Sequence, residues 1–90
     1  MANNGTPPAP TPRYNRILDE SVDIARTMRH AHVGVEHLFL AIIRDRGAVP
    51  SQALAQQIDL AEVESHLLEL LNSPGYRTLP ATRREDDEPG

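Results

Sequence analysis

Residues 29–43, RHAHVGVEHLFLAII, contain the pattern that decides the fold of this chain. A short segment with Gly34 precedes a set of apolar residues at positions 35, 38, 39, 42 and 43. This spacing is typical of an amphipathic helix with one apolar face. Glu36 falls in the first turn, where exposed amides and the helix dipole favour negative charge. The stretch therefore predicts a loop followed by a helix over residues 35–44.

An earlier helix is expected to begin at Thr11 or Pro12. Threonine is a good N-cap, and proline suits the first helical position because its missing N–H would be unpaired there. The apolar stripe that predicts this helix consists of Ile17, Leu18, Val22, Ala25 and Met28. We expect the helix to end near Arg29.

Two further helices are expected after Gly47. One begins near Pro50 or Ser51 and carries Leu54, Ala55 and Ile58. The next begins at Asp59, which has Glu62 three residues later in the arrangement of a capping box, and it stops at residues 72–75 (NSPG). No segment alternates at period two. The sequence therefore predicts an all-α fold, a compact bundle of four short helices.

The foldable part of the chain is short. Residues 1–10 are rich in proline and predict a disordered arm, and residues 74–90 carry the run RREDDE and predict a disordered charged tail. Residues 11–73 remain as one domain. Domains of about 60 residues are marginally stable alone, so oligomerisation is a natural source of stability.

Composition bears on the class of protein. The formal charge of −4 and the three aromatic residues disfavour a nucleic-acid partner. The longest apolar run, residues 38–43, is far shorter than the roughly 20 residues that span a bilayer. The chain has no cysteine, and its N-terminus lacks the pattern of a signal peptide. We expect a cytoplasmic protein without a membrane partner.

Three segments carry a family resemblance: residues 11–18 (TPRYNRIL), 34–42 (GVEHLFLAI) and 57–63 (QIDLAEV). In this order and spacing they resemble the Clp N-terminal repeat, whose pattern is roughly T-x-R-A-x-x-V-L, G-T-E-H-L-L-L-G-L and G-V-D-L-x-x-V. The repeat forms the N-domain of the ClpA, ClpB and ClpC unfoldases, and the likeness is nearest to ClpC. One departure is Val35, which stands where the family usually has threonine.

The resemblance implies an expectation about assembly. The family N-domain holds two repeats about a pseudo-twofold axis, whereas this sequence has one, and no G-x-x-x-x-G-K-[ST] motif of an ATPase module occurs in it. We therefore expect a stand-alone repeat, and a homodimer that reproduces the two-repeat arrangement.

The resemblance also implies a ligand site. The ClpC N-domain accepts phosphoarginine, so Glu36 is expected to bind the guanidinium and Thr11 to lie near the phosphate, with Arg13 adding positive charge. The implied partners are phosphoarginine-marked proteins or cyclic peptides that target ClpC N-domains, together with a ClpC-type unfoldase. The chain would act as an adaptor or as a decoy.

Simpler interpretations remain open for the same residues. Glu36 is also explained as a helix-dipole acid, and Thr11 as an ordinary N-cap. The alternative function is a protein-interaction module that pairs with Clp-repeat proteins and regulates the unfoldase without a ligand site. The residues show no catalytic motif, so no enzyme and no cofactor is expected. His30, His32 and His37 have no cysteine or H-E-x-x-H pair beside them, so no metal site is expected either.

Overall fold

The helices of this chain are short because capping signals and prolines follow one another closely along the sequence. The computed structural model describes residues 6–78. In that range it contains α1 (Pro12–Thr27), α2 (Val35–Arg44), α3 (Val49–Ala55), α4 (Leu60–Leu71) and α5 (Pro74–Thr78). No strand occurs in these residues, which confirms the all-α prediction.

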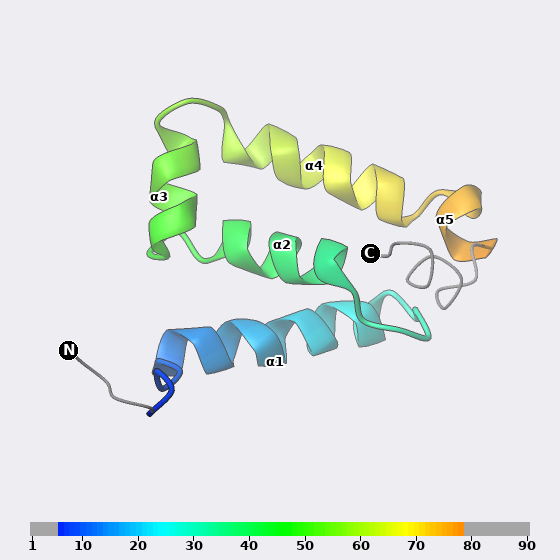
Figure 1. Ribbon diagram of the computed structural model, residues 1–90. Coiled ribbons are helices and arrows are strands. Elements are labelled where there is room, and N and C mark those ends of the chain that lie inside the picture. The colour runs from blue at the N-terminus through cyan, green and yellow to red at the C-terminus, as the bar shows by residue number, and fades with distance from the viewer. Residues whose placement is uncertain (1–5, 79–90) are drawn as a thin grey trace.

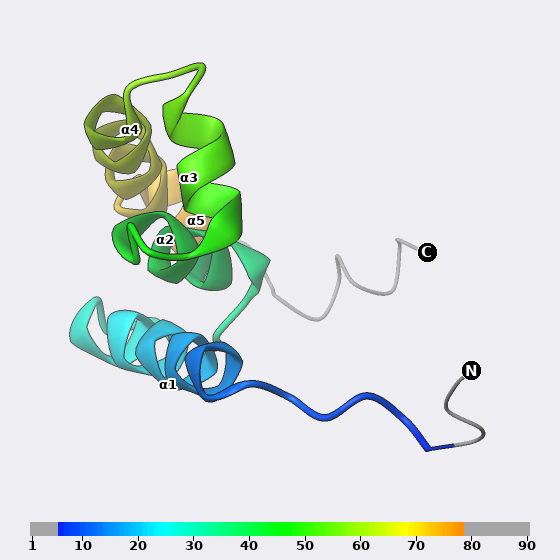
Figure 2. The same ribbon diagram turned by 90° about the vertical axis from the view of Figure 1, so that its left-hand side faces the viewer.

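The helices form layers with α2 in the middle (Figure 1). α1 packs along one side of α2, and α4 packs along the other side. α3 crosses between the ends of α2 and α4, and α5 follows α4 at the far end of the layer. Seen along the helices, α1 lies apart from α3 and α4, with α2 between them (Figure 2). α2 therefore contacts α1, α3 and α4.

The core lies around α2. Its buried members are Ile24, Leu40, Ala41, Ile43, Leu60 and Leu71. Burial of each large aliphatic side chain contributes about 1.5–3 kcal/mol, so this small set supplies most of the free energy that holds the layers together. No helix between residues 6 and 78 has the length and apolar character needed to cross a membrane.

The predicted bounds of α2 are confirmed, but its predicted apolar face is wrong in part. Val35 is 77% exposed and Phe39 is 38% exposed, whereas His37, Leu40 and Ala41 are buried. The reason is that α2 has neighbours on two sides. The buried side chains of α2 point towards α1 and α4. The sequence pattern alone does not reveal on which sides these neighbours lie.

The stripe predicted for α1 is also wrong in part. Leu18 and Val22 are 38% and 42% exposed, and Ser21 and Ile24 are buried in their place. The hydroxyl of Ser21 donates to the carbonyl oxygen of Leu18 at 2.7 Å, which satisfies its polar group inside the helix. Serine therefore occupies a core-facing position without an unpaired donor.

α1 ends in a left-handed turn that directs the following loop. Arg29 has φ 62°, and its N–H donates to the carbonyl of Arg26. The N–H of His30 donates to the carbonyl of Ala25 at 2.9 Å, so the pattern is a Schellman motif with arginine where glycine is usual. This turn places His30 beside the start of α2.

The start of the expected tail is ordered. The prediction of a tail from residue 74 differs from the structure, because Pro74–Thr78 form α5. Ser73 initiates this helix, since its hydroxyl oxygen accepts the N–H of Tyr76 at 3.2 Å. The remainder of the predicted tail, residues 79–90, and the first five residues of the predicted arm lie outside the described residues.

Candidate functional site

Thr11 and Arg13, two of the predicted ligand residues, lie at the start of α1. Thr11 is the N-cap, and its Oγ1 accepts the N–H of Tyr14 at 3.1 Å. Arg13 Nε donates to Oδ2 of Asp45, which follows α2, at 2.9 Å. This bond from Arg13, assisted by the N–H of Gly47, holds the pKa of the Asp45 carboxyl below its ordinary value. Both Thr11 and Arg13 therefore already have partners within the chain.

Glu36, the third predicted ligand residue, lies in the first turn of α2. Its Oε2 accepts the hydroxyl of Tyr76 from α5. Its carboxylate also folds back over Gly34, where an added Cβ would lie 2.7 Å from Oε2. A glycine at position 34 thus leaves room for this conformation of Glu36. The carboxylate connects the start of α2 with α5.

The three predicted residues are not gathered at one place in the chain. α1 and α2 run antiparallel, so the start of α1 lies beside the end of α2 (Figure 1). Thr11 and Arg13 are at this end of the pair, and Glu36 is at the other end. The structure therefore brings Thr11 close to Arg13 and separates both from Glu36.

A histidine pair, in which His37 is buried and His30 is half-buried, lies beside Glu36. The side chain of His37 is fully buried, and its Nδ1 accepts the N–H of Gly34 at 2.9 Å. Its Nε2 lies 2.8 Å from Nδ1 of His30. Burial lowers the pKa of His37, although the nearby charge of Glu36 acts in the opposite direction. His37 is therefore held in its neutral form by its surroundings.

The aromatic ring of Tyr76 completes this cluster. Its centroid is 5.0 Å from that of His30 and 6.3 Å from that of His37. This cluster as a whole could not be seen in the sequence, where the histidines were weighed as metal ligands and interpreted as loop and capping residues. One signal was available, because His37 stands three residues after the N-cap Gly34, the position from which a side chain accepts the N-cap amide.

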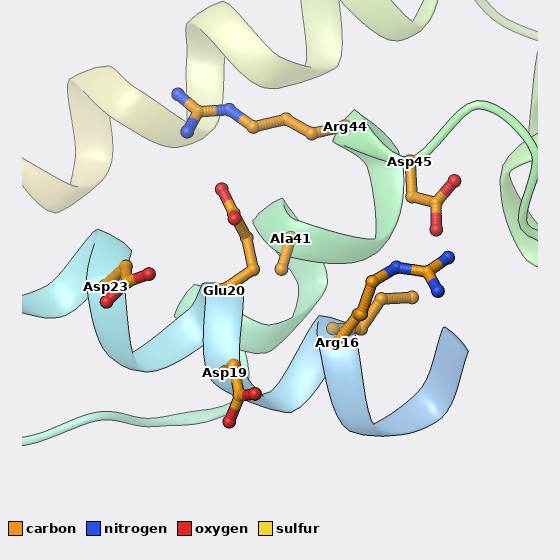
Figure 3. A pocket seen from close by; sticks show the side chains of 8 residues that line it. Arg16, Asp19, Glu20, Asp23, Ala41, Arg44 and Asp45 are labelled. Atoms are coloured by element: carbon orange, nitrogen blue, oxygen red, sulfur yellow. The ribbon is translucent and has the colours of Figure 1, made fainter. Parts of the chain in front are cut away.

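A cleft also lies between α1 and α2, on the side that faces α4 (Figure 3). It has a volume of about 410 Å³ and is lined by Arg16, Ile17, Asp19, Glu20, Asp23, Ala41, Arg44 and Asp45. Three of its charges are used in ion pairs. Asp23 binds Arg26 and Arg44 binds Glu64, each at 2.8 Å, and Asp45 binds Arg13 at 2.9 Å. The cleft therefore carries charges of both signs without a defined ligand geometry.

Metal binding has no geometric basis in the part of the chain that the structure describes. There, no three side chains of histidine, aspartate or glutamate are grouped as a metal ion would require. Three of the four ring nitrogens of the histidine pair are directed at each other or at the backbone, which uses lone pairs that a metal would need.

Comparison with known proteins places this geometry in a family. Residues 2–57 match the model of the Clp repeat (R) N-terminal domain. A ClpA homolog of the Clp protease ATP-binding subunit from Guillardia theta is 37% identical over 62 residues, which are 68% of this chain. The negative regulator of genetic competence ClpC/MecB from Bacillus subtilis is 34% identical over 64 residues, or 70% of the chain.

A ClpC ATP-binding subunit from Staphylococcus epidermidis is 31% identical over 65 residues, or 71% of the chain. In each of these relatives the match covers 8% of the relative's own length. No solved structure matches the chain. The matched domain is a substrate-interaction module rather than a catalytic one. The motifs, the helical fold and the family match agree, and this chain belongs to the Clp repeat N-terminal domain family.

Proposed function

We propose that this chain is a non-enzymatic recognition module of the Clp protease system. Its ligands in this proposal are phosphoarginine-marked proteins, or cyclic peptides that target ClpC N-domains. The observation that carries the proposal is the carboxylate of Glu36, in the first turn of α2 within the family's G-x-E-H-L motif. A carboxylate matches the planar guanidinium, and such charge-assisted bonds are about twice as strong as neutral ones.

The separation of Glu36 from Thr11 and Arg13 favours a site shared by two copies. A twofold axis perpendicular to α1 and α2 reverses their direction, so the Thr11 end of one chain lies at the Glu36 end of the other. Each dimer then has two equivalent sites. In each site one copy supplies the guanidinium-binding carboxylate and the other supplies Arg13 and the amides of a helix N-terminus for the phosphate.

An exposed apolar stripe on α1 suits this pairing. Tyr14, Leu18 and Val22 are 56%, 38% and 42% exposed and follow one another at intervals of four residues, so they share one face. They lie on the opposite side of α1 from the cleft residues Arg16 and Glu20. The spacing is symmetric about Leu18, so antiparallel pairing sets Tyr14 of one chain against Val22 of the other.

Sedimentation equilibrium tests the pairing. We expect the wild type to form dimers at tens of micromolar and Leu18→Glu to be monomeric with an unchanged helical circular dichroism spectrum. The matched control is Leu70→Glu on α4, which is 56% exposed in the wild type and lies outside the stripe. A monomeric wild type at this concentration would rule out the shared site.

Calorimetric titration with phosphoarginine tests the ligand. Phosphoserine and unmodified arginine serve as ligand controls, and we expect selective micromolar binding by the wild type. Glu36→Gln removes the charge and should weaken binding by roughly 2–5 kcal/mol, because a guanidinium would lose its partner. Glu69→Gln, an exposed acid on α4, should bind as the wild type does. Equal affinity of the Glu36 variant would remove this residue from the site.

In a cell such a module acts on a ClpC-type unfoldase in one of two ways. An adaptor passes its bound client to the unfoldase, whereas a decoy sequesters the ligand. The decoy needs only the ligand site, and the adaptor needs a second surface as well. Degradation of a phosphoarginine-marked client by a ClpC-type unfoldase separates them, because an adaptor accelerates this reaction and a decoy slows it.

One observation favours the alternative, a protein-interaction module without a ligand site. Each predicted ligand residue has a partner in the chain: the amide of Tyr14 for Thr11, Asp45 for Arg13 and Tyr76 for Glu36. A pull-down of Clp-repeat proteins distinguishes the two functions. Free phosphoarginine should release the partner from a reception module and leave the complex of an interaction module intact.

A further inference from the structure

The hydrogen bonds of the His30–His37 pair determine the position of every ring proton when both rings are neutral. The amide of Gly34 can only donate, so Nδ1 of His37 must be an acceptor. A neutral His37 therefore carries its proton on Nε2 and donates it to Nδ1 of His30. The proton of a neutral His30 then lies on Nε2, which is buried and has no hydrogen-bond partner among the described residues.

This arrangement has no place for an additional proton. A proton on Nδ1 of His37 would face the N–H of Gly34 and break that bond. A proton on Nδ1 of His30 would face the N–H of His37 and break the bond between the rings. Proton uptake by either ring therefore disrupts the pair, and it introduces a charge into a buried place.

Tyr76 connects the protonation state of the histidine pair to α5. Its ring lies against both imidazoles, and its hydroxyl donates to Glu36. Through these contacts the side chain of Tyr76 reaches from α5 to the start of α2, whereas α5 itself packs against α4. A shift of either imidazole changes the surface on which the Tyr76 ring rests.

We propose that the Tyr76 side chain of α5 is a lid over Glu36 that is closed while the His30–His37 pair is neutral and opens when the pair takes up a proton. Opening removes the Tyr76 hydroxyl from the carboxylate of Glu36. The loss of this bond regulates ligand binding only if Glu36 binds a ligand, so this consequence rests on the proposed function. The opening itself does not.

The groups around the histidine pair determine whether the lid opens at low or at high pH. Glu36 from α2 faces His37 and favours its charged form, whereas burial disfavours that form and is the larger effect. The loop after α1 contributes His30, and α5 contributes Tyr76. Among the described residues, α4 adds no charged group that acts on His37. The lid is therefore closed at neutral pH and opens on acidification.

An NMR titration of the full chain from pH 8 to pH 5 tests the lid. The ¹⁵N shifts of His37 should show a proton on Nε2 at pH 8 and uptake of a second proton below the ordinary histidine range. Tyr76 ring protons should start at ring-current-shifted positions and move towards those of the exposed Tyr14 as this uptake proceeds. For one proton, the ratio of open to closed lid rises by at most about tenfold per pH unit.

Two variants sharpen the titration. His30→Asn keeps an acceptor for His37 but does not titrate, so it should shift or reduce the movement of Tyr76. His66→Asn changes an exposed histidine on α4 and should leave the movement as in the wild type. Tyr76 signals that stay constant while His37 takes up its proton would overturn the lid. Because the titration contains no ligand, that result leaves phosphoarginine binding untouched, and calorimetry tests that binding separately.

Discussion

The two ends of the α1/α2 pair are held together by different chemistry. At one end, Arg13 and Asp45 form an ion pair in which the side chains are 45% and 24% exposed. At the other end, His37 is fully buried and joins Gly34 to His30 by neutral hydrogen bonds. The ion pair at the first end is therefore open to water and salt, whereas the side chain of His37 at the second end is shielded from both.

The difference predicts which end of the α1/α2 pair is more easily destabilised. Exposed ion pairs contribute little because water and salt screen them, and the loss of one partner leaves the other hydrated. A buried network behaves in the opposite way, because a lost partner leaves a donor or acceptor unpaired without water. The end that holds Glu36 should therefore be more sensitive to substitution and to pH than the end that holds Thr11.

The largest effect is expected at His37. His37→Ala leaves the amide of Gly34 and Nδ1 of His30 without a partner and creates a cavity, so the free energy of unfolding should fall by about 2–4 kcal/mol. Urea denaturation measures this loss. His66→Ala on the exposed face of α4 should stay within about 0.5 kcal/mol of the wild type. An equal effect of the two substitutions would contradict the comparison of the two ends.

A smaller effect on the free energy of unfolding is expected from pH. The pH range in which stability is lost differs between the two ends of the α1/α2 pair. The pKa of folded His37 lies below its ordinary value of 6.5, so below pH 6.5 the unfolded chain binds a proton that the folded chain does not. The stabilising contribution of His37 is complete above this pH. It declines as the pH falls towards the folded pKa, by at most about 1.4 kcal/mol per pH unit.

The pKa of folded Asp45 is also lowered, from an ordinary value of 3.8. Its contribution is therefore present above pH 3.8 and is lost only as the pH falls further, towards the folded pKa. Urea denaturation of the wild type and of His30→Asn between pH 8 and pH 5 isolates the histidine end, because Asp45 stays ionised there. A flat stability profile in this range would show that the histidine pair is not linked to folding.

The smallest effect is a gain in stability. Arg29 holds a left-handed conformation that costs a non-glycine residue free energy, so Arg29→Gly should raise the free energy of unfolding by about 0.5–1 kcal/mol. Arg26→Gly, three residues earlier and inside α1, should lower it by about 1 kcal/mol. Thermal or urea denaturation compares them, and a loss in both variants would mean that the turn at Arg29 is not strained.

The helices could be predicted from the sequence because their signals are local. The N-caps at Thr11 and Asp59 and the periodic pattern after Gly34 each lie within one or two turns. The directions of the buried faces could not be predicted, because they depend on which helices flank α2. Phe39 was expected in the core for this reason and is 38% exposed.

The candidate site was predicted less completely than the fold. The sequence placed Glu36 at a helix start, and the structure agrees. It could not show that α1 and α2 run antiparallel with Thr11 and Glu36 at opposite ends. Nor could it show the contact of Tyr76 with Glu36, which spans 40 residues and joins a segment that was expected to be a tail. Such contacts follow from the packing of α4 and α5 rather than from any local pattern.

A mixing experiment tests the central claim, a ligand site shared by two copies, most directly. Arg13→Ala and Glu36→Gln each damage both sites of a homodimer, so neither variant alone should bind phosphoarginine in a calorimetric titration. Equal mixing makes about half of the dimers mixed, and each mixed dimer regains one of its two sites. The account predicts recovery of about a quarter of the wild-type sites, and no recovery from two inactive variants would contradict it.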